Sequence, residues 1–105
     1  MSVGVARRDT RASINAVETI RAGSPDALAA LYREYGRALY RLAYRLTGTR
    51  EDAEDVVHDV FVGLPEALGR YQERGSFAGW LKRVTARLAL MRLRTRTRRL
   101  VLLER

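Results

Sequence analysis

Large apolar residues recur along this chain at alternating steps of three and four positions, the period of one face of an α-helix. The clearest series comprises Leu28, Leu31, Tyr35, Leu39, Leu42 and Leu46. No stretch alternates apolar and polar residues with the period of two that marks a half-buried strand. The spacing therefore predicts an all-α fold, a compact bundle of about four helices.

Capping residues predict where the central helices begin and end. Ser24 and Pro25 form a start signal, because Ser caps a helix N-terminus and Pro is tolerated in the first turn. Gly48 ends this long helix, since Gly adopts the left-handed conformation of a C-cap. Thr49 with Asp52 three residues later resembles a capping box and starts the next helix.

The remaining elements follow from the same signals. Ile14, Val17 and Ile20 share one helical face that Gly23 closes, and Pro65 breaks or kinks the helix after Thr49. A polar loop covers residues 70–75, and Ser76 caps the last helix. The predicted buried stripe of that helix is Phe77, Trp80, Leu81, Val84, Leu88 and Met91.

The length of 105 residues suits one domain. Residues 1–12 are polar and aperiodic and are predicted to be a disordered tail, residues 13–99 form the helical domain, and residues 100–105 are a C-terminal extension or the start of a linker. The chain has no Cys, no signal-peptide pattern and no apolar run long enough for a membrane span. We therefore expect a cytoplasmic protein with no membrane partner.

Charge is sorted along the chain, whose net charge is +8. Residues 77–99 carry eight Lys or Arg and no acid, whereas residues 50–69 carry six acids and a single Arg. A short helical chain with this pattern has one basic and one acidic face. The pattern indicates nucleic acid on one side and a protein partner on the other.

Residues for catalysis or metal binding are scarce. The acids Glu51, Asp52, Glu54, Asp55 and Asp59 form a cluster, but the single His58 does not complete the repeated Glu-x-x-His pattern of a di-iron bundle. A clustered acidic helix is more often a solvated or partner-facing surface. We expect no enzymatic activity, no metal site and no cofactor.

Three motifs carry a resemblance to a known family. They are LYREY at the start of the long helix, the block TGTREDAEDVVHDVF, and GSFAGWLKRVTARLALMRLR in the last helix. As a set, at these distances, they resemble region 2 of the extracytoplasmic-function (ECF) branch of sigma-70 family sigma factors. The likeness covers roughly residues 14–99. It implies a domain that binds core RNA polymerase and recognises and melts the promoter −10 element.

The resemblance also implies a polymerase-binding face on the acidic helix. The β′ clamp helices would contact Asp55, His58, Asp59 and Val62, with an anti-sigma factor as a further candidate partner. For Asp52 the favoured interpretation is helix capping. For the apolar residues of the same helix it is core packing, and these residues are Val56, Val57, Val60 and Phe61.

The DNA-binding face implied by the resemblance holds the non-template strand of the −10 element. It consists of the loop and the basic helix, with candidate residues Arg70, Tyr71, Gln72, Arg74, Ser76, Arg83, Arg87, Arg92 and Arg94. Holding an opened strand requires a pocket for an unstacked base and contacts to its backbone. Tyr71 is equally suited to base stacking and to loop packing, whereas Trp80 lies on the apolar stripe and favours core packing.

The sequence departs from the family pattern at several positions. His58 stands where Gln is usual, Arg87 where Asn is frequent, Met91 where Asp is frequent, and Pro65 where Trp is frequent. The changes in the last helix affect the expected −10 base preference. The family's second domain, which reads the −35 element, has no counterpart in this sequence, and truncation is the favoured explanation.

Two other functions remain open at this point. One is a single-domain regulatory protein that occupies the polymerase clamp or an anti-sigma factor without initiating transcription. The other, which the motif set disfavours, is a basic helical protein that coats nucleic acid without sequence preference. The docking face alone does not separate the first alternative from a sigma factor.

Overall fold

The computed structural model describes residues 18, 20, 23–71 and 75–104. Within these ranges the chain forms helices and no strand, so the predicted all-α class is confirmed. The helices are α2 (Pro25–Thr47), α3 (Arg50–Val62), α4 (Leu64–Leu68) and α5 (Phe77–Glu104). The expected tail at residues 1–12, and Ile14 and Val17 of the expected first helix, lie outside the described residues.

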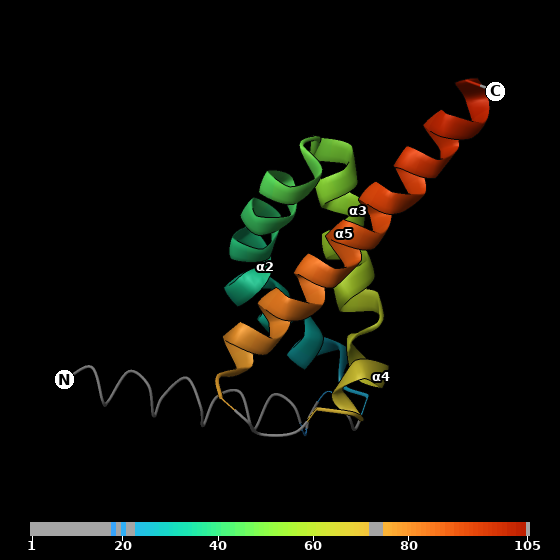
Figure 1. Cartoon of the computed structure of the whole chain (residues 1–105). Helices are drawn as coiled ribbons and strands as arrows, with labels where there is room; N and C mark the ends of the chain where they lie inside the picture. The colour runs from blue at the N-terminus through green and yellow to red at the C-terminus, as the bar shows by residue number, and fades with distance from the viewer. Residues whose placement is uncertain (1–17, 19, 21–22, 72–74, 105) are drawn as a thin grey trace.

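The bundle consists of three long helices in mutual contact. α2 and α3 form a helical hairpin, and α5 runs across both of them (Figure 1). The short α4 follows α3 and leads into the loop before α5. The C-terminal half of α5 extends beyond the other helices (Figure 1). Each of the three long helices therefore has one side against a shared core and an outer side that is exposed.

Both ends of α2 have the predicted caps. The Ala27 N–H donates to Ser24 Oγ at 3.3 Å, and Pro25 occupies the first turn. At the other end, Gly48 has φ +82°, and its N–H donates to the Tyr44 carbonyl at 2.8 Å. A residue with a side chain would be strained in this left-handed conformation, so Gly is required at this turn.

The structure also confirms the predicted limits of α3. The Asp52 N–H donates to Thr49 Oγ1 at 3.2 Å, which is half of a capping box. α3 ends at Val62, and α4 begins at Leu64 with Pro65 in its first turn. Because Pro lacks an N–H and crowds the preceding turn, the chain restarts as a new helix at this point.

Small residues complete the core on the buried sides of the helices. Leu31, Leu39 and Leu81 are buried as the spacing predicts. Among the buried residues are also several small ones, which are Gly36, Ala43, Thr47, Ala53, Thr85 and Ala89. Because core packing is dense, the short side chains at these positions let the helix backbones approach each other.

The prediction that Met91 belongs to the buried stripe of α5 is wrong. Its side chain is 53% exposed. The fully buried line instead runs from Phe77 and Leu81 to Thr85 and Ala89, at four-residue steps. The Thr85 hydroxyl donates to the Leu81 carbonyl at 2.8 Å, so its O–H donor is satisfied inside the core.

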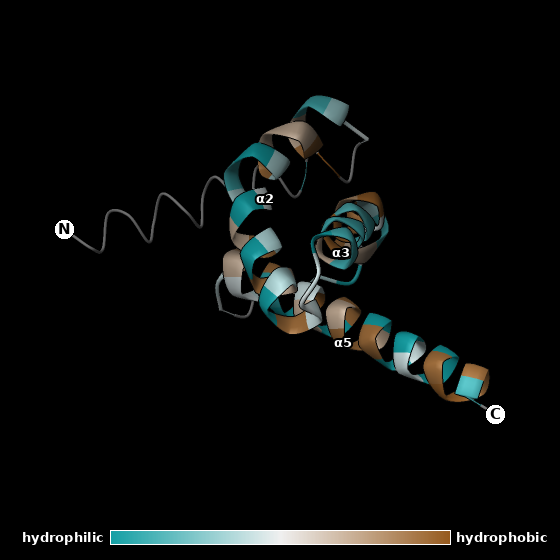
Figure 2. Cartoon of the chain, turned by 90° about the horizontal axis from the view of Figure 1, so that it is seen from above, coloured by the Kyte–Doolittle hydropathy of each residue, from teal (hydrophilic) through white to brown (hydrophobic). Residues whose placement is uncertain are grey.

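The projecting end of α5 is not amphipathic. Hydrophobic and hydrophilic residues alternate around it (Figure 2), and Leu100, Val101, Leu102 and Leu103 are all exposed. In the part of the chain that the structure describes, no helix is long and apolar enough to cross a membrane.

Candidate functional site

The acidic helix α3 presents the four predicted docking residues on one exposed side. Asp55, His58, Asp59 and Val62 recur at steps of three and four positions and are all exposed, Val62 to 64%. The opposite side of α3 is buried. The prediction of core packing is confirmed there for Val56, Val57, Val60 and Phe61.

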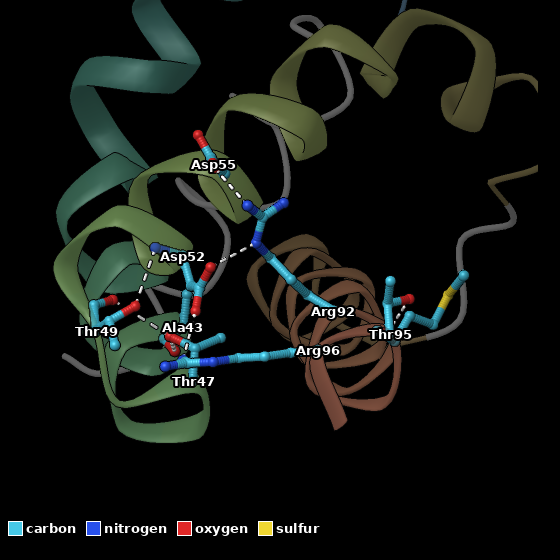
Figure 3. A network of polar contacts seen from close by, with 9 residues as sticks. Ala43, Thr47, Thr49, Asp52, Asp55, Arg92, Thr95 and Arg96 are labelled. Carbon is cyan, nitrogen blue, oxygen red and sulfur yellow. Dashed lines mark hydrogen bonds and ion pairs between the residues drawn. The ribbon is translucent and has the colours of Figure 1, made fainter. Parts of the chain in front are cut away.

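An ion-pair network joins this acidic helix to the basic helix (Figure 3). Arg92 Nε donates to Asp52 Oδ1 at 2.8 Å, and Arg92 Nη2 donates to Asp55 Oδ2 at 2.6 Å. Arg96 Nη1 donates to Asp52 Oδ2 at 3.0 Å. The structure therefore brings a predicted DNA contact, Arg92, together with a predicted polymerase contact, Asp55. The sequence reasoning missed this pairing.

The carboxylate of Asp52 is the best-shielded member of the network, because its side chain is only 17% exposed. The hydrogen bond from Arg92 has the largest effect and one with Thr49 the second largest, and together they hold the pKa of Asp52 below its ordinary value of 3.8. The bond between Arg92 and Asp52 also raises the pKa of Arg92. Asp52 lies in the capped first turn of α3, and its carboxylate also accepts hydrogen bonds from Arg92 and Arg96 that link α5 to α3.

We expect Asp52→Asn to lower the free energy of unfolding near neutral pH by about 1–2 kcal/mol, because two charged hydrogen bonds are weakened. A lowered folded-state pKa stabilises the fold above the ordinary Asp pKa, and this stability is lost as pH falls through the folded-state value. Urea unfolding of both proteins from neutral to acidic pH measures the effect. Their stabilities should converge in acid, whereas the exposed control Glu54→Gln should match the parent throughout.

The arginines of α5 divide between two sides of the helix. Arg83, Arg87 and Arg94 recur at intervals of four and seven residues, so they share one side, and all three are exposed. Arg92 lies on a different side, half-buried against α3. Arg83, Arg87 and Arg94 are therefore available to a ligand, whereas Arg92 is already paired with Asp52 and Asp55.

A hollow of about 360 Å³ lies beside this arginine side, between α5 and the ends of α3 and α4. Apolar and aromatic side chains form much of its wall, and charged groups stand around it. Its lining residues include Trp80, Val84, Arg70, Arg87 and Asp59. A concave apolar surface with a few charged groups is the usual form of a site for a small ligand.

The aromatic residues next to the hollow pack on one another. The Tyr71 ring lies 5.0 Å from the Trp80 ring and 5.6 Å from the Phe77 ring, measured between centroids. Phe77 is buried, whereas Tyr71 and Trp80 are half-buried. Trp80 therefore packs against the core as predicted and also lines the hollow, and Tyr71 belongs to the same cluster.

Of the other predicted DNA contacts that the structure describes, only Arg70 lines the hollow, and Ser76 caps α5 instead. Arg70 is exposed and lines the hollow. The Ser76 hydroxyl accepts a hydrogen bond from the Gly79 N–H at 2.9 Å, so it caps α5 as predicted. Gln72 and Arg74 lie outside the described residues.

Among the side chains that the structure describes, no group of His, Cys, Asp or Glu is arranged to hold a metal ion.

Comparison with known proteins identifies the family. The model of the family described as Sigma-70 region 2 matches residues 31–99. An ECF RNA polymerase sigma factor, SigE of Mycolicibacterium smegmatis, is 43% identical over 68 residues, which are 65% of this chain and 26% of that protein.

Two further relatives match a larger part of the chain. The ECF RNA polymerase sigma factor SigM of Mycobacterium tuberculosis is 30% identical over 89% of this chain and 47% of its own length. SigW of Bacillus subtilis, also an ECF RNA polymerase sigma factor, is 27% identical over 74% of the chain and 42% of its own length. The chain spans less than half the length of these relatives. It belongs to the sigma-70 region 2 family and, within it, to the ECF group.

Proposed function

We propose that this domain acts in transcription initiation, by docking on the β′ clamp helices of core RNA polymerase and holding the melted non-template strand of the −10 element. The observation that carries the proposal is that one core presents two exposed surfaces of opposite charge, which adjoin at Asp59 on the edge of the hollow. The acidic side of α3 is available to a protein, and the arginine side of α5 borders a hollow of suitable form.

The docking part of the proposal assigns the contact to Asp55, His58, Asp59 and Val62. Two exposed carboxylates, followed by an exposed Val62 at the end of α3, provide both steering by charge and an apolar contact. Asp55 would leave Arg92 to pair with a cation of the partner, because both groups compete for the same carboxylate.

In the proposed complex an unstacked base of the non-template strand occupies the hollow, and the phosphate backbone of that strand contacts the neighbouring arginines. An unstacked base recovers part of its stacking energy on an aromatic or apolar surface, and Trp80 and Val84 provide one. Arg87 lies at the hollow and carries donors for a base edge or a phosphate. Arg83 and Arg94 continue the phosphate contacts on either side of it.

Binding to single-stranded DNA tests this assignment. The domain is expected to prefer the non-template strand of its −10 element over a scrambled strand at matched salt. Arg87→Ala should reduce that preference by about tenfold, as expected for one lost contact to a base edge of about 1–3 kcal/mol. Lys82→Ala is the control, because it removes one exposed charge from another side of α5.

Fluorescence anisotropy with both strands measures the ratio of affinities. Equal binding of the two strands, with the same salt dependence for both, would contradict specific strand holding. If the chain then still binds core RNA polymerase, its behaviour would match that of a regulatory protein that occupies the clamp without initiating transcription.

A further inference from the structure

A second basic surface lies on α2, and the sequence reasoning did not select it. Arg33, Arg37, Arg41 and Arg45 follow one another at four-residue steps and are all exposed. Four residues of α-helix rise by about 6 Å, so the stripe spans about 18 Å along one straight element. Because the buried side of α2 carries Leu31, Leu39 and Ala43, this arginine stripe points away from the core.

The arginine stripe is unneutralised. Within residues 23–71 and 75–104, none of its four guanidinium groups lies within ion-pair distance of a carboxylate, although Glu34 is on the same helix. The contrast with α5 is direct, because Arg92 and Arg96 are paired with acids of α3. Like charges four residues apart destabilise a helix by a few tenths of a kcal/mol per pair. The stripe therefore carries a cost that a polyanionic ligand would remove.

Two tyrosines accompany the arginine stripe. Tyr40 and Tyr44 follow Arg33 and Arg37 by seven residues, so they border the same side of α2. Their rings stack with centroids 6.2 Å apart, and Tyr44 is 47% exposed. Phenol hydroxyls can donate hydrogen bonds to phosphate oxygens, as arginine guanidinium groups also do.

We propose that the arginine stripe of α2 binds the phosphate backbone of duplex DNA without reading its sequence. The duplex is a rigid rod with about one negative charge per 1.7 Å of axis, and a straight row of arginines complements it without the ordering that a flexible single strand requires. The stripe is distinct from the arginine side of α5, so it adds a contact to those of the proposed function and does not depend on them.

The test measures binding of the 105-residue chain to a short duplex that lacks a −10 sequence, over a series of salt concentrations. The double variant Arg37→Ala with Arg41→Ala is expected to bind about tenfold or more weakly at low salt. The slope of log affinity against log salt should become shallower by about 1.8, as expected for two lost phosphate contacts. Retention of binding by Arg37→Lys with Arg41→Lys would agree with sequence-independent charge contacts.

The matched control removes the same charge elsewhere. Arg50→Ala with Lys82→Ala deletes two exposed cations outside the arginine stripe, and it should change the slope much less. An equal loss in the control would mean that only net charge matters and would overturn the proposal. Equal affinity of the chain for polyglutamate of matched charge would also overturn it, because the surface would then suit an acidic protein.

The same variants separate this inference from the proposed function. The Arg37 and Arg41 variants should keep the preference for the −10 strand over a scrambled strand, since that ratio depends on α5 and the hollow. Loss of strand preference in Arg87→Ala, with duplex binding unchanged in the α2 variants, would reject the stripe alone. The reverse pattern would reject the strand-holding assignment alone.

Discussion

Asp55→Arg is expected to weaken binding of the domain to core RNA polymerase by about 30-fold or more, which corresponds to about 2 kcal/mol. The substitution replaces an exposed carboxylate in the middle of the proposed docking face by a cation. It both removes an attractive contact and places a like charge against a basic partner surface. Capture of core polymerase on the immobilised domain, over a range of concentrations, measures the change.

Two matched variants separate the loss of the Asp55 contact from a general change of charge and from the loss of the ion pair with Arg92. Glu54→Arg makes the same change of charge on the neighbouring exposed position, which lies off the docking face, and should have a much smaller effect. Arg92→Ala breaks the same ion pair from the other side but leaves the Asp55 carboxylate in place. It should bind polymerase at least as well as the parent. If Arg92→Ala and Asp55→Arg lose binding equally, the ion pair matters and the carboxylate contact does not.

Leu81→Ala should lower the free energy of unfolding by about 3 kcal/mol, within the range for deleting a buried leucine side chain. Leu81 has no exposed surface and lies in the middle of the buried line of α5, where that helix meets the others. Since a small domain has a total stability of only about 5–15 kcal/mol, the loss is a large part of it. Urea denaturation followed by circular dichroism measures the difference.

The control for this prediction makes the same chemical change on the same helix. Leu90 is 45% exposed, so Leu90→Ala removes little buried area and should change stability by about 0.5 kcal/mol or less. A similar loss in both variants would contradict the assignment of the buried line. It would instead indicate that the exposed side of α5 at Leu90 packs against another surface in solution.

Local signals made much of the fold predictable. The caps at Ser24, Thr49 and Ser76, the stop at Gly48 and the break at Pro65 depend on residues a few positions away, and the structure has all of them. Such signals need no knowledge of the tertiary arrangement, because they satisfy or remove backbone hydrogen bonds within one turn.

Positions that depend on the approach of two helices were not predictable in this way. Large apolar residues usually mark buried faces, and on that basis the sequence predicts Met91 in the core. In the structure the buried line of α5 instead passes through Thr85 and Ala89, whose side chains are short. The pairing of Arg92 with Asp52 joins residues that are 40 positions apart. Only the crossing of α5 over α3 determines which arginines are used internally and which remain exposed.

Under the proposed function, Arg92 and a cation of the polymerase compete for the carboxylate of Asp55, so polymerase binding and DNA binding are coupled. If a polymerase cation takes Asp55 from Arg92, the guanidinium loses one acidic partner and becomes a better ligand for phosphate. Thermodynamic linkage then requires the reverse, so a strand that attracts Arg92 must strengthen polymerase binding by the same factor. The two ligands would act as heterotropic partners through a single pair of side chains, and Arg92→Ala would make their affinities independent.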